Sequence, residues 1–316
     1  MEKNIHTQSD HSVLDAPHIR TTALDSGYSS VNLYDQVDST TTRARELLMD
    51  GTDPEREQLG ELSIYASLYQ SAGRGRLARA WTAPPGACLA ASIVVRPHAS
   101  ADPLARELPE GSYHWMTLIA GLSVVDIWRG YGVDAALKWP NDVLVDGARK
   151  ICGILAQLAP ASSPFTTAAI LGYGVNIGQE RAILPTAQAT SLAAEGDQSA
   201  GEDPTGVAHE LLGQILAGLD RRISSLVRHG DAMSAGLLAE AEAALPLIGT
   251  RIALASPTDA SGTPALEGLA LGRAPTGALL LRTADGHSHR IDAGGVLTTG
   301  IPLTPVHDTK EKRANN

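Results

Sequence analysis

The sequence predicts an α+β fold in which a mixed sheet flanked by helices is followed by a small β-barrel. Three observations lead to this prediction. Alternating or continuous apolar runs predict strands at 63–70, 88–95, 135–139, 143–145, 150–158 and 166–177. Apolar residues at helical spacing predict helices at 113–128 and 212–226. From residue 247 onward, short strand-like runs alternate with Pro, Gly and Asp turns, which is typical of a small barrel.

Local signals delimit the remaining elements. Ser39 and the threonines that follow it are typical of a helix N-cap, and they precede a short helix at 43–48. Asp146-Gly147 is a hairpin dipeptide, so it joins two neighbouring strands. One more helix is predicted at 235–245. The barrel strands are predicted at 251–255, 266–271, 278–283 and 288–291.

Polarity and the pattern of apolar residues divide the chain of 316 residues into four segments. Residues 1–30 are polar without a sustained period, and we interpret them as a flexible extension. Residues 31–246 hold the mixed sheet and its helices, and we expect a catalytic domain there. The small barrel follows at 247–303, and residues 304–316 form a polar tail.

Charge and apolar content exclude several classes of protein. Lys and Arg number 25 against 35 Asp and Glu, a net charge of −10, so a whole-protein basic field for DNA is excluded. No run approaches the length that spans a bilayer, and the first ten residues have no apolar signal-peptide core. We therefore expect a cytoplasmic protein with no DNA or membrane partner. Cys88 and Cys152 lie in apolar runs and are expected to be buried, and no metal site is predicted.

The segment GRGRLARAW at 73–81 carries the strongest local signal. Glycine allows the backbone to approach a ligand closely, and arginine pairs bidentately with carboxylate or phosphate. In an acidic protein such a cluster favours an anion site. A solvated basic loop and an RNA-binding segment are the alternatives, although the latter usually repeats and this one does not.

The segment KWPND at 138–142 ends an apolar strand with a lysine. A partly buried ammonium group needs an anionic partner, so Lys138 is a candidate for binding a ligand anion. The alternative is a strand end from which the lysine reaches solvent. Asp142 and Asn141 suit a structural role, because both side chains can bind turn amides.

Glycines inside two predicted strands indicate a surface against which a flat ligand lies. They are Gly153, in KICGIL, and Gly172 and Gly174, in GYGVN. Asn176 suits either the edge of a base or the cap of a turn. The chain lacks a GxxxxGK[ST] phosphate loop, an HExxH zinc motif and a GxSxG nucleophile elbow.

Taken in order, these motifs resemble biotin protein ligase. Asp38-Ser39-Thr40, QxxGRGRxxRxW at 70–81, KWPND at 138–142, KxxGIL at 150–155 and GxGxN at 172–176 match the family's sequence motifs over about residues 31–303. The resemblance implies a class II synthetase-like catalytic domain with a C-terminal SH3-like barrel. It also implies that biotin and Mg-ATP form biotinyl-5′-AMP, whose biotinyl group passes to a lysine of a biotin carboxyl carrier domain in an acyl-CoA or pyruvate carboxylase. A monomer or weak homodimer is expected.

The resemblance also implies roles for individual residues. Lys138 and Arg74 would be catalytic. The biotin site would comprise Ser39, Thr40, Thr41, Gln70, Arg74, Gly75, Arg76, Lys138, Gly153, Leu155, Gly172 and Gly174. The nucleotide site would comprise Arg74, Arg76, Trp81, Lys138 and Asn176.

Two departures from the family pattern accompany the match. Ala78 stands where the family loop carries a later glycine, which bears on loop ordering because alanine disfavours a left-handed backbone. The regulatory members carry a winged helix-turn-helix that residues 1–30 do not resemble, so we expect ligation without repression. The alternatives are lipoate–protein ligase, whose loop typically carries Arg-Arg and a glycine triplet, and a non-catalytic biotin- or nucleotide-binding protein.

Overall fold

The computed structural model describes residues 30–49, 62–95, 112–160, 167–255, 264–292 and 295–297. All but one residue of the predicted N-terminal extension, and the whole predicted C-terminal tail, lie outside the described residues.

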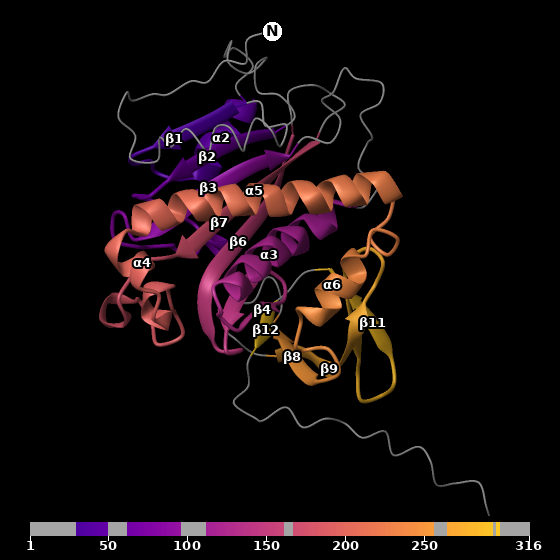
Figure 1. Ribbon diagram of the computed structural model, residues 1–316. Helices are drawn as coiled ribbons and strands as arrows, with labels where there is room; N and C mark the ends of the chain where they lie inside the picture. The colour runs from indigo at the N-terminus through magenta and orange to yellow at the C-terminus, as the bar shows by residue number, and fades with distance from the viewer. Residues whose placement is uncertain are drawn as a thin grey trace, which may run out of the picture.

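A seven-stranded sheet forms the larger part of the molecule (Figure 1). Its strands are β1 (Ser30–Tyr34), β2 (Leu62–Ser67), β3 (Cys88–Val95), β4 (Ala135–Lys138), β5 (Asp142–Val145), β6 (Arg149–Pro160) and β7 (Thr167–Asn176). Their order is β1-β2-β3-β7-β6-β5-β4. The pair β1–β2 is parallel and the remaining pairs are antiparallel. The predicted mixed sheet is therefore confirmed.

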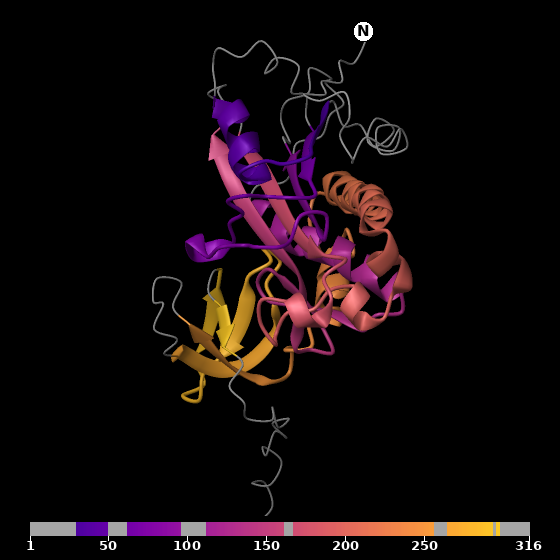
Figure 2. The same cartoon turned by 90° about the vertical axis from the view of Figure 1, so that its left-hand side faces the viewer.

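The helices cover both faces of this sheet. They are α2 (Thr40–Met49), α3 (Tyr113–Gly130), α4 (Gln198–Glu202), α5 (Pro204–His229) and α6 (Leu237–Ala243). Alternation along β3 explains the two faces, because Leu89, Ala91 and Ile93 join the core with α3 and α5, whereas Val94 joins a separate core with α2. Figures 1 and 2 show α3 and α5 together on one face and α2 on the other.

The longest helix, α5, begins and ends at strong local signals. The Asp203 carboxylate accepts the Gly206 amide at 2.9 Å, and Pro204 occupies the first turn, where its missing N–H costs nothing. Gly230 ends the helix in a left-handed conformation. The buried guanidinium of Arg222 bonds to Asp126 and Glu240, so its charge is compensated. The sequence prediction found this helix but placed its start eight residues late.

Two further sequence predictions are confirmed. Asp146 and Gly147 have positive φ angles, 50° and 65°, in the three-residue turn between β5 and β6, where the Ala148 amide donates to the Val145 carbonyl at 3.0 Å. Both cysteines are buried and free. Burial raises the pKa of Cys88 to about 11 and also raises that of Cys152, so neither thiol is a ready nucleophile at neutral pH.

A second sheet follows α6 and is wholly antiparallel. Its strands are β8 (Arg251–Ala255), β9 (Pro264–Arg273), β10 (Leu279–Arg282), β11 (Ser288–Ile291) and β12 (Gly295–Leu297), in the order β11-β10-β9-β8-β12. The sequence predicted the first four and missed β12, which is three residues long. Figure 2 shows this C-terminal sheet on the same side of the larger sheet as α2.

Candidate active site

Glycines of two central strands leave a side-chain-free floor on the larger sheet. Gly153 pairs with Gly174, and Leu155 pairs with Gly172, across β6 and β7. A Cβ atom on Gly172 would lie 2.7 Å from the Thr41 hydroxyl, and one on Gly174 would lie 2.5 Å from the Trp81 ring. Both distances are shorter than real Cβ contacts, so a side chain at either position would force Thr41 or Trp81 to move. We call this floor and its walls the glycine slot.

Hydroxyl and amide groups form one end of the glycine slot. The Gln70 side-chain oxygen accepts the backbone N–H of Thr40 at 2.8 Å and its hydroxyl at 3.2 Å. The buried Ser92 hydroxyl lies 2.8 Å from that of Thr40 and 2.9 Å from that of Thr41. Ser39 acts as the predicted cap, accepting the Thr42 amide at 3.3 Å. These groups suit a planar ligand with both donors and acceptors.

The segment 73–81, which we call the GRGR loop, folds back over the slot as a narrow hairpin. The Trp81 amide donates to the Gly73 carbonyl at 2.9 Å, and the Gly75 amide donates to the Arg79 carbonyl at 2.8 Å. One residue of its single 3₁₀ turn has a left-handed backbone, and that residue is Leu77 (φ 56°, ψ 35°), not Ala78. The substitution of the family's later glycine by Ala78 therefore does not place a left-handed backbone on alanine.

A hydrogen-bond chain ties this loop to the KWPND turn. Arg76 donates to the side-chain oxygen of Asn141 at 2.9 Å, and the Asn141 amide donates to the Ile154 carbonyl at 2.9 Å. Burial lowers the pKa of Arg76, an effect that Asp142 opposes and Arg79 reinforces. The loop arginine is thus partly desolvated and held beside the slot, where a charged group acts strongly on a bound anion.

Trp81 fills the glycine slot. Its indole packs on Gly174 and Gly153, with the Lys150 ammonium 5.4 Å from the ring centroid. Lys150 also pairs with the Asp142 carboxylate at 2.7 Å. The space left inside is only about 50 Å³. A ligand that lies on the glycine floor must therefore displace the indole.

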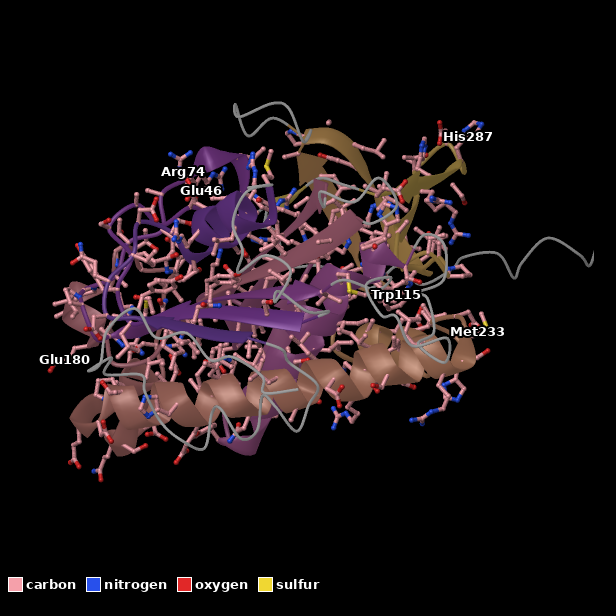
Figure 3. The ribbon with its side chains drawn as sticks, turned by 90° about the horizontal axis from the view of Figure 1, so that it is seen from above. Glu46, Arg74, Trp115, Glu180, Met233 and His287 are labelled. Carbon is pink, nitrogen blue, oxygen red and sulfur yellow. The ribbon has the colours of Figure 1, made fainter. Side chains whose placement is uncertain are left out.

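A much larger groove adjoins the slot. Its volume is about 1220 Å³, and its walls come from α2, the GRGR loop, β6 and Asp292, which follows β11. Arg74 and Glu46, both labelled in Figure 3, are among the residues that line it. A macromolecular partner can approach the slot through this groove.

The structure brings most of the sequence-predicted residues to these two spaces. Those lining the slot, the groove or both are Ser39, Thr40, Thr41, Gln70, Arg74, Gly75, Arg76, Trp81, Gly153, Leu155, Gly172 and Gly174. Lys138 lines neither space. It is half-buried and pairs across the hairpin with Asp142, which places both side chains on the same face of the sheet.

Asn176 also lines neither space. Its side chain is buried, its amide nitrogen donates to the Thr190 carbonyl at 2.8 Å, and its oxygen accepts from Gln179 at 3.0 Å. In this conformation Asn176 acts as the turn residue that sequence reasoning had kept as an alternative.

Five residues at the slot were not predicted as site residues: Ser92, Asn141, Lys150, Ile154 and Tyr173. Two of them had a usable signal. Ser92 is a hydroxyl inside a fully buried strand, and Lys150 opens the KxxGIL motif.

Within the described ranges, the structure offers neither a metal site nor a helix suited to a membrane. No group of three or more His, Cys, Asp or Glu side chains there could hold a metal ion. None of the helices that the structure describes combines the length and apolar character that crossing a bilayer requires.

Comparison with known proteins places this site in a family. Residues 34–176, which hold every predicted site residue, match the biotin/lipoate A/B protein ligase family. The biotin–[acetyl-CoA-carboxylase] ligase of Paracoccus denitrificans is 30% identical over 221 residues, which cover 67% of this chain and 81% of that protein. The chain belongs to the biotin/lipoate A/B protein ligase family.

Other relatives of the family differ in length from this chain. The bifunctional ligase/repressor BirA of Bacillus spizizenii is 30% identical over 201 residues, or 63% of this chain, and the chain spans only about half of that relative (55%). The biotin protein ligase of Aquifex aeolicus, solved in complex with biotin and ATP, superposes with a TM-score of 0.57 at 22% identity, covering 84% of this chain and 97% of that one. The fold of this family member is thus that of a biotin protein ligase.

Proposed function

We propose that the protein joins biotin to a lysine of a biotin carboxyl carrier domain, using Mg-ATP and forming biotinyl-5′-AMP. The observation that carries the proposal is the glycine slot. A flat floor, a hydroxyl and amide end, and arginines at the opening suit a ligand with a flat polar ring system and a carboxylate tail. The names of the relatives in Paracoccus and Aquifex support biotin as that ligand.

Biotin binding begins with the departure of Trp81 from the slot. The ureido ring then lies on Gly153, Gly172 and Gly174, within reach of the hydroxyl and amide groups at the slot's end. The displaced indole covers the ligand from above, where it faces the adenine of ATP. Asn176 would join the nucleotide only by giving up its bonds to Thr190 and Gln179.

The first chemical step joins two anions. A carboxylate oxygen of biotin attacks the α-phosphorus, the bond to the β-phosphate oxygen breaks, and pyrophosphate leaves with the bonding electron pair. Lys138, Arg74 and Arg76 stabilise the negative charge that develops, because fixed cations in a desolvated site lower the barrier without reorganisation. Binding energy also holds the two reactants together.

The second step transfers the biotinyl group. The neutral amine of the carrier lysine attacks the acyl carbon, the bond to the AMP oxygen breaks, and the amine proton passes to solvent. The large groove gives the carrier domain of an acyl-CoA or pyruvate carboxylase access to this carbon. The GRGR loop keeps water from the adenylate until the carrier arrives.

The domain organisation supports this assignment. We propose that residues 31–246 are the class II synthetase-like catalytic domain and that residues 247–303, with their five-stranded antiparallel sheet, are the SH3-like domain. The reaction requires ATP and a carboxylase, both of which the cytoplasm supplies. A monomer or a weak homodimer stays the prediction for the assembly.

Biotin-dependent release of pyrophosphate from ATP tests the proposal without a carrier domain. We expect release with biotin, accumulation of biotinyl-5′-AMP, and no comparable release with lipoate at equal concentration. Release with lipoate alone would assign the protein to lipoate ligation instead. Binding of biotin with no release of pyrophosphate in the presence of either acid would identify a non-catalytic binding protein.

A further inference from the structure

A second cavity, the junction cavity, lies where the C-terminal sheet meets the larger sheet. Its volume is about 360 Å³. The first turns of α3 form one wall, and the turn between β9 and β10 forms another. Trp115 holds the two together, because its indole N–H donates to the Pro275 carbonyl at 2.8 Å; Figure 3 shows it at the end of α3 beside the C-terminal sheet.

Arg273 lines this cavity and is only 5% exposed. One guanidinium nitrogen donates to the Gly277 carbonyl. The other two nitrogens, Nε and Nη1, are buried without a hydrogen-bond partner. Such groups are rare in folded proteins, and each one calls for an explanation.

No carboxylate pairs with this guanidinium within the ranges that the structure describes. Glu242 is near enough to favour the charged form, but its oxygen accepts the main-chain N–H of Arg273 instead. Burial lowers the pKa of Arg273 to about 10, so the group is still protonated at neutral pH. The guanidinium is therefore a cation without a carboxylate partner in the cavity wall. Its Nε and Nη1 atoms have no contact with solvent, so an anion in the cavity reaches them when the side chain turns toward it.

The helix that forms the opposite wall also favours an anion. α3 is 18 residues long, and its first-turn residues Tyr113, His114 and Met116 line the cavity. The N-cap residue Ser112 makes no side-chain hydrogen bond to the first turn, where backbone N–H groups carry the positive end of the helix dipole. Asp292 is the opposing charge in the lining, but it is about half-exposed and lies 3.3 Å from Arg290.

The junction cavity and the large groove adjoin each other. Both are lined by Thr117, Pro140, Ala156, Gln157 and Asp292. The groove also contains Arg74 and Arg76, so two further cations line the neighbouring space. This concentration of positive charge favours a small, multiply charged oxyanion over an acidic side chain of a bound protein.

We propose that the junction cavity binds a phosphate-class oxyanion between Arg273 and the N-terminus of α3. Inorganic pyrophosphate and the polyphosphate end of a nucleotide share this chemistry. The site is separate from the glycine slot and does not depend on the identity of the acid bound there.

Calorimetric titration of the full chain with pyrophosphate tests the site. The Arg74→Ala/Arg76→Ala double variant is the starting protein, because it removes the other arginine cluster. We expect pyrophosphate to bind this protein, Arg273→Met to weaken that binding about tenfold or more, and Arg273→Lys to restore part of it. Arg282→Met is the matched control, because Arg282 is exposed on the neighbouring strand β10.

A parallel titration with a non-hydrolysable ATP analogue separates the two sources. Binding of pyrophosphate through Arg273 identifies the free anion, and binding of the analogue alone through Arg273 identifies the nucleotide. Absence of both, or binding that Arg273→Met leaves unchanged, overturns the proposal. Thermal unfolding supplies a second readout: pyrophosphate should raise the Tm of the starting protein and leave that of its Arg273→Met derivative unchanged. Loss of ligase activity is not a readout here, so failure of the proposed function and failure of this site are distinguishable.

Discussion

The glycine slot and the junction cavity differ in whether their cationic side chains have polar partners. In the slot, Lys150 pairs with Asp142 and Arg76 donates to Asn141, and the space between them is filled by Trp81. In the junction cavity, Arg273 keeps two buried nitrogens without partners beside an open volume. The slot therefore has to be opened by its ligand, whereas the cavity is already shaped for one.

The two sites therefore differ in what a ligand must displace before it binds. A ligand of the slot must displace an indole and exchange existing contacts, which lowers its apparent affinity but couples binding to loop movement. A ligand of the cavity would satisfy a buried cation after a turn of its guanidinium, and no indole has to leave first. Variants of the slot should consequently change activity and ligand binding, whereas a variant of the cavity without ligand should change stability, and by a smaller amount.

The largest effect is expected on the slot side, for Lys138→Ala. Lys138 shares a sheet face with Asp142, whose carboxylate pairs with Lys150 at the slot. In the proposed mechanism this cation stabilises the developing charge, and its loss should lower biotin-dependent pyrophosphate release about a thousandfold. The Tm should stay within about 4 °C of the wild-type value, because no described side chain depends on Lys138 for an ion pair. Release at more than a tenth of the wild-type rate would remove Lys138 from the mechanism.

Gly174→Ala should have the next largest effect. The new methyl group would enter the space that Trp81 now occupies, 2.5 Å from its ring, and would raise the floor under the ligand. We expect about a hundredfold loss of adenylate formation, the usual size when reacting groups are displaced by an ångström. Gly213→Ala is the matched control, since nothing lies within 4 Å of its Cβ position and its activity should not change. Equal activity of both variants would contradict a glycine floor.

A smaller, spectroscopic effect is expected from Trp81. It is half-buried, whereas Trp115, Trp128 and Trp139 are at most 3% exposed. Biotin should displace it and shift tryptophan emission, and Trp81→Phe should abolish the shift while keeping an aromatic ring. A shift that survives in the Phe variant would mean that the indole does not leave the slot.

The smallest effect is expected on the cavity side, in stability. Arg273→Met without ligand should raise the Tm by about 2–4 °C, because it replaces an unpaired buried cation by an apolar chain of similar length. Differential scanning calorimetry at pH 7 measures it, with Arg282→Met as the unchanged control. A clear fall in Tm would show that Arg273 is compensated and that the contrast between the two sites is wrong.

The sequence predicted ten of the twelve strands that the structure describes, all but β1 and β12, because apolar periodicity is present in both sheets. It also predicted the slot, since GRGR, KxxGIL and GxGxN each have a reason to contain glycine or arginine there. It did not predict Ser92, which is one hydroxyl in an apolar strand, or the filling of the slot by Trp81, which depends on contacts between distant segments.

The burial of Arg273 could not be predicted from the sequence for a similar reason. An arginine beside Gly272 reads as an ordinary exposed turn residue, and only the packing of α3 against the β9–β10 turn buries it. Asn176 shows the reverse case. Its motif suggests a nucleotide contact, which stays a prediction, whereas the hydrogen bonds of its side chain to Thr190 and Gln179 depend on segments that the motif does not contain.

The most direct test of the central claim is biotin transfer to a purified biotin carboxyl carrier domain, followed by intact-protein mass measurement. We predict that the carrier gains one biotinyl group only when ATP and biotin are both present. A carrier whose acceptor lysine is replaced by arginine should gain none, and an excess of lipoate should not compete. An unmodified carrier under these conditions, or a carrier that gains a lipoyl group instead, would contradict the account.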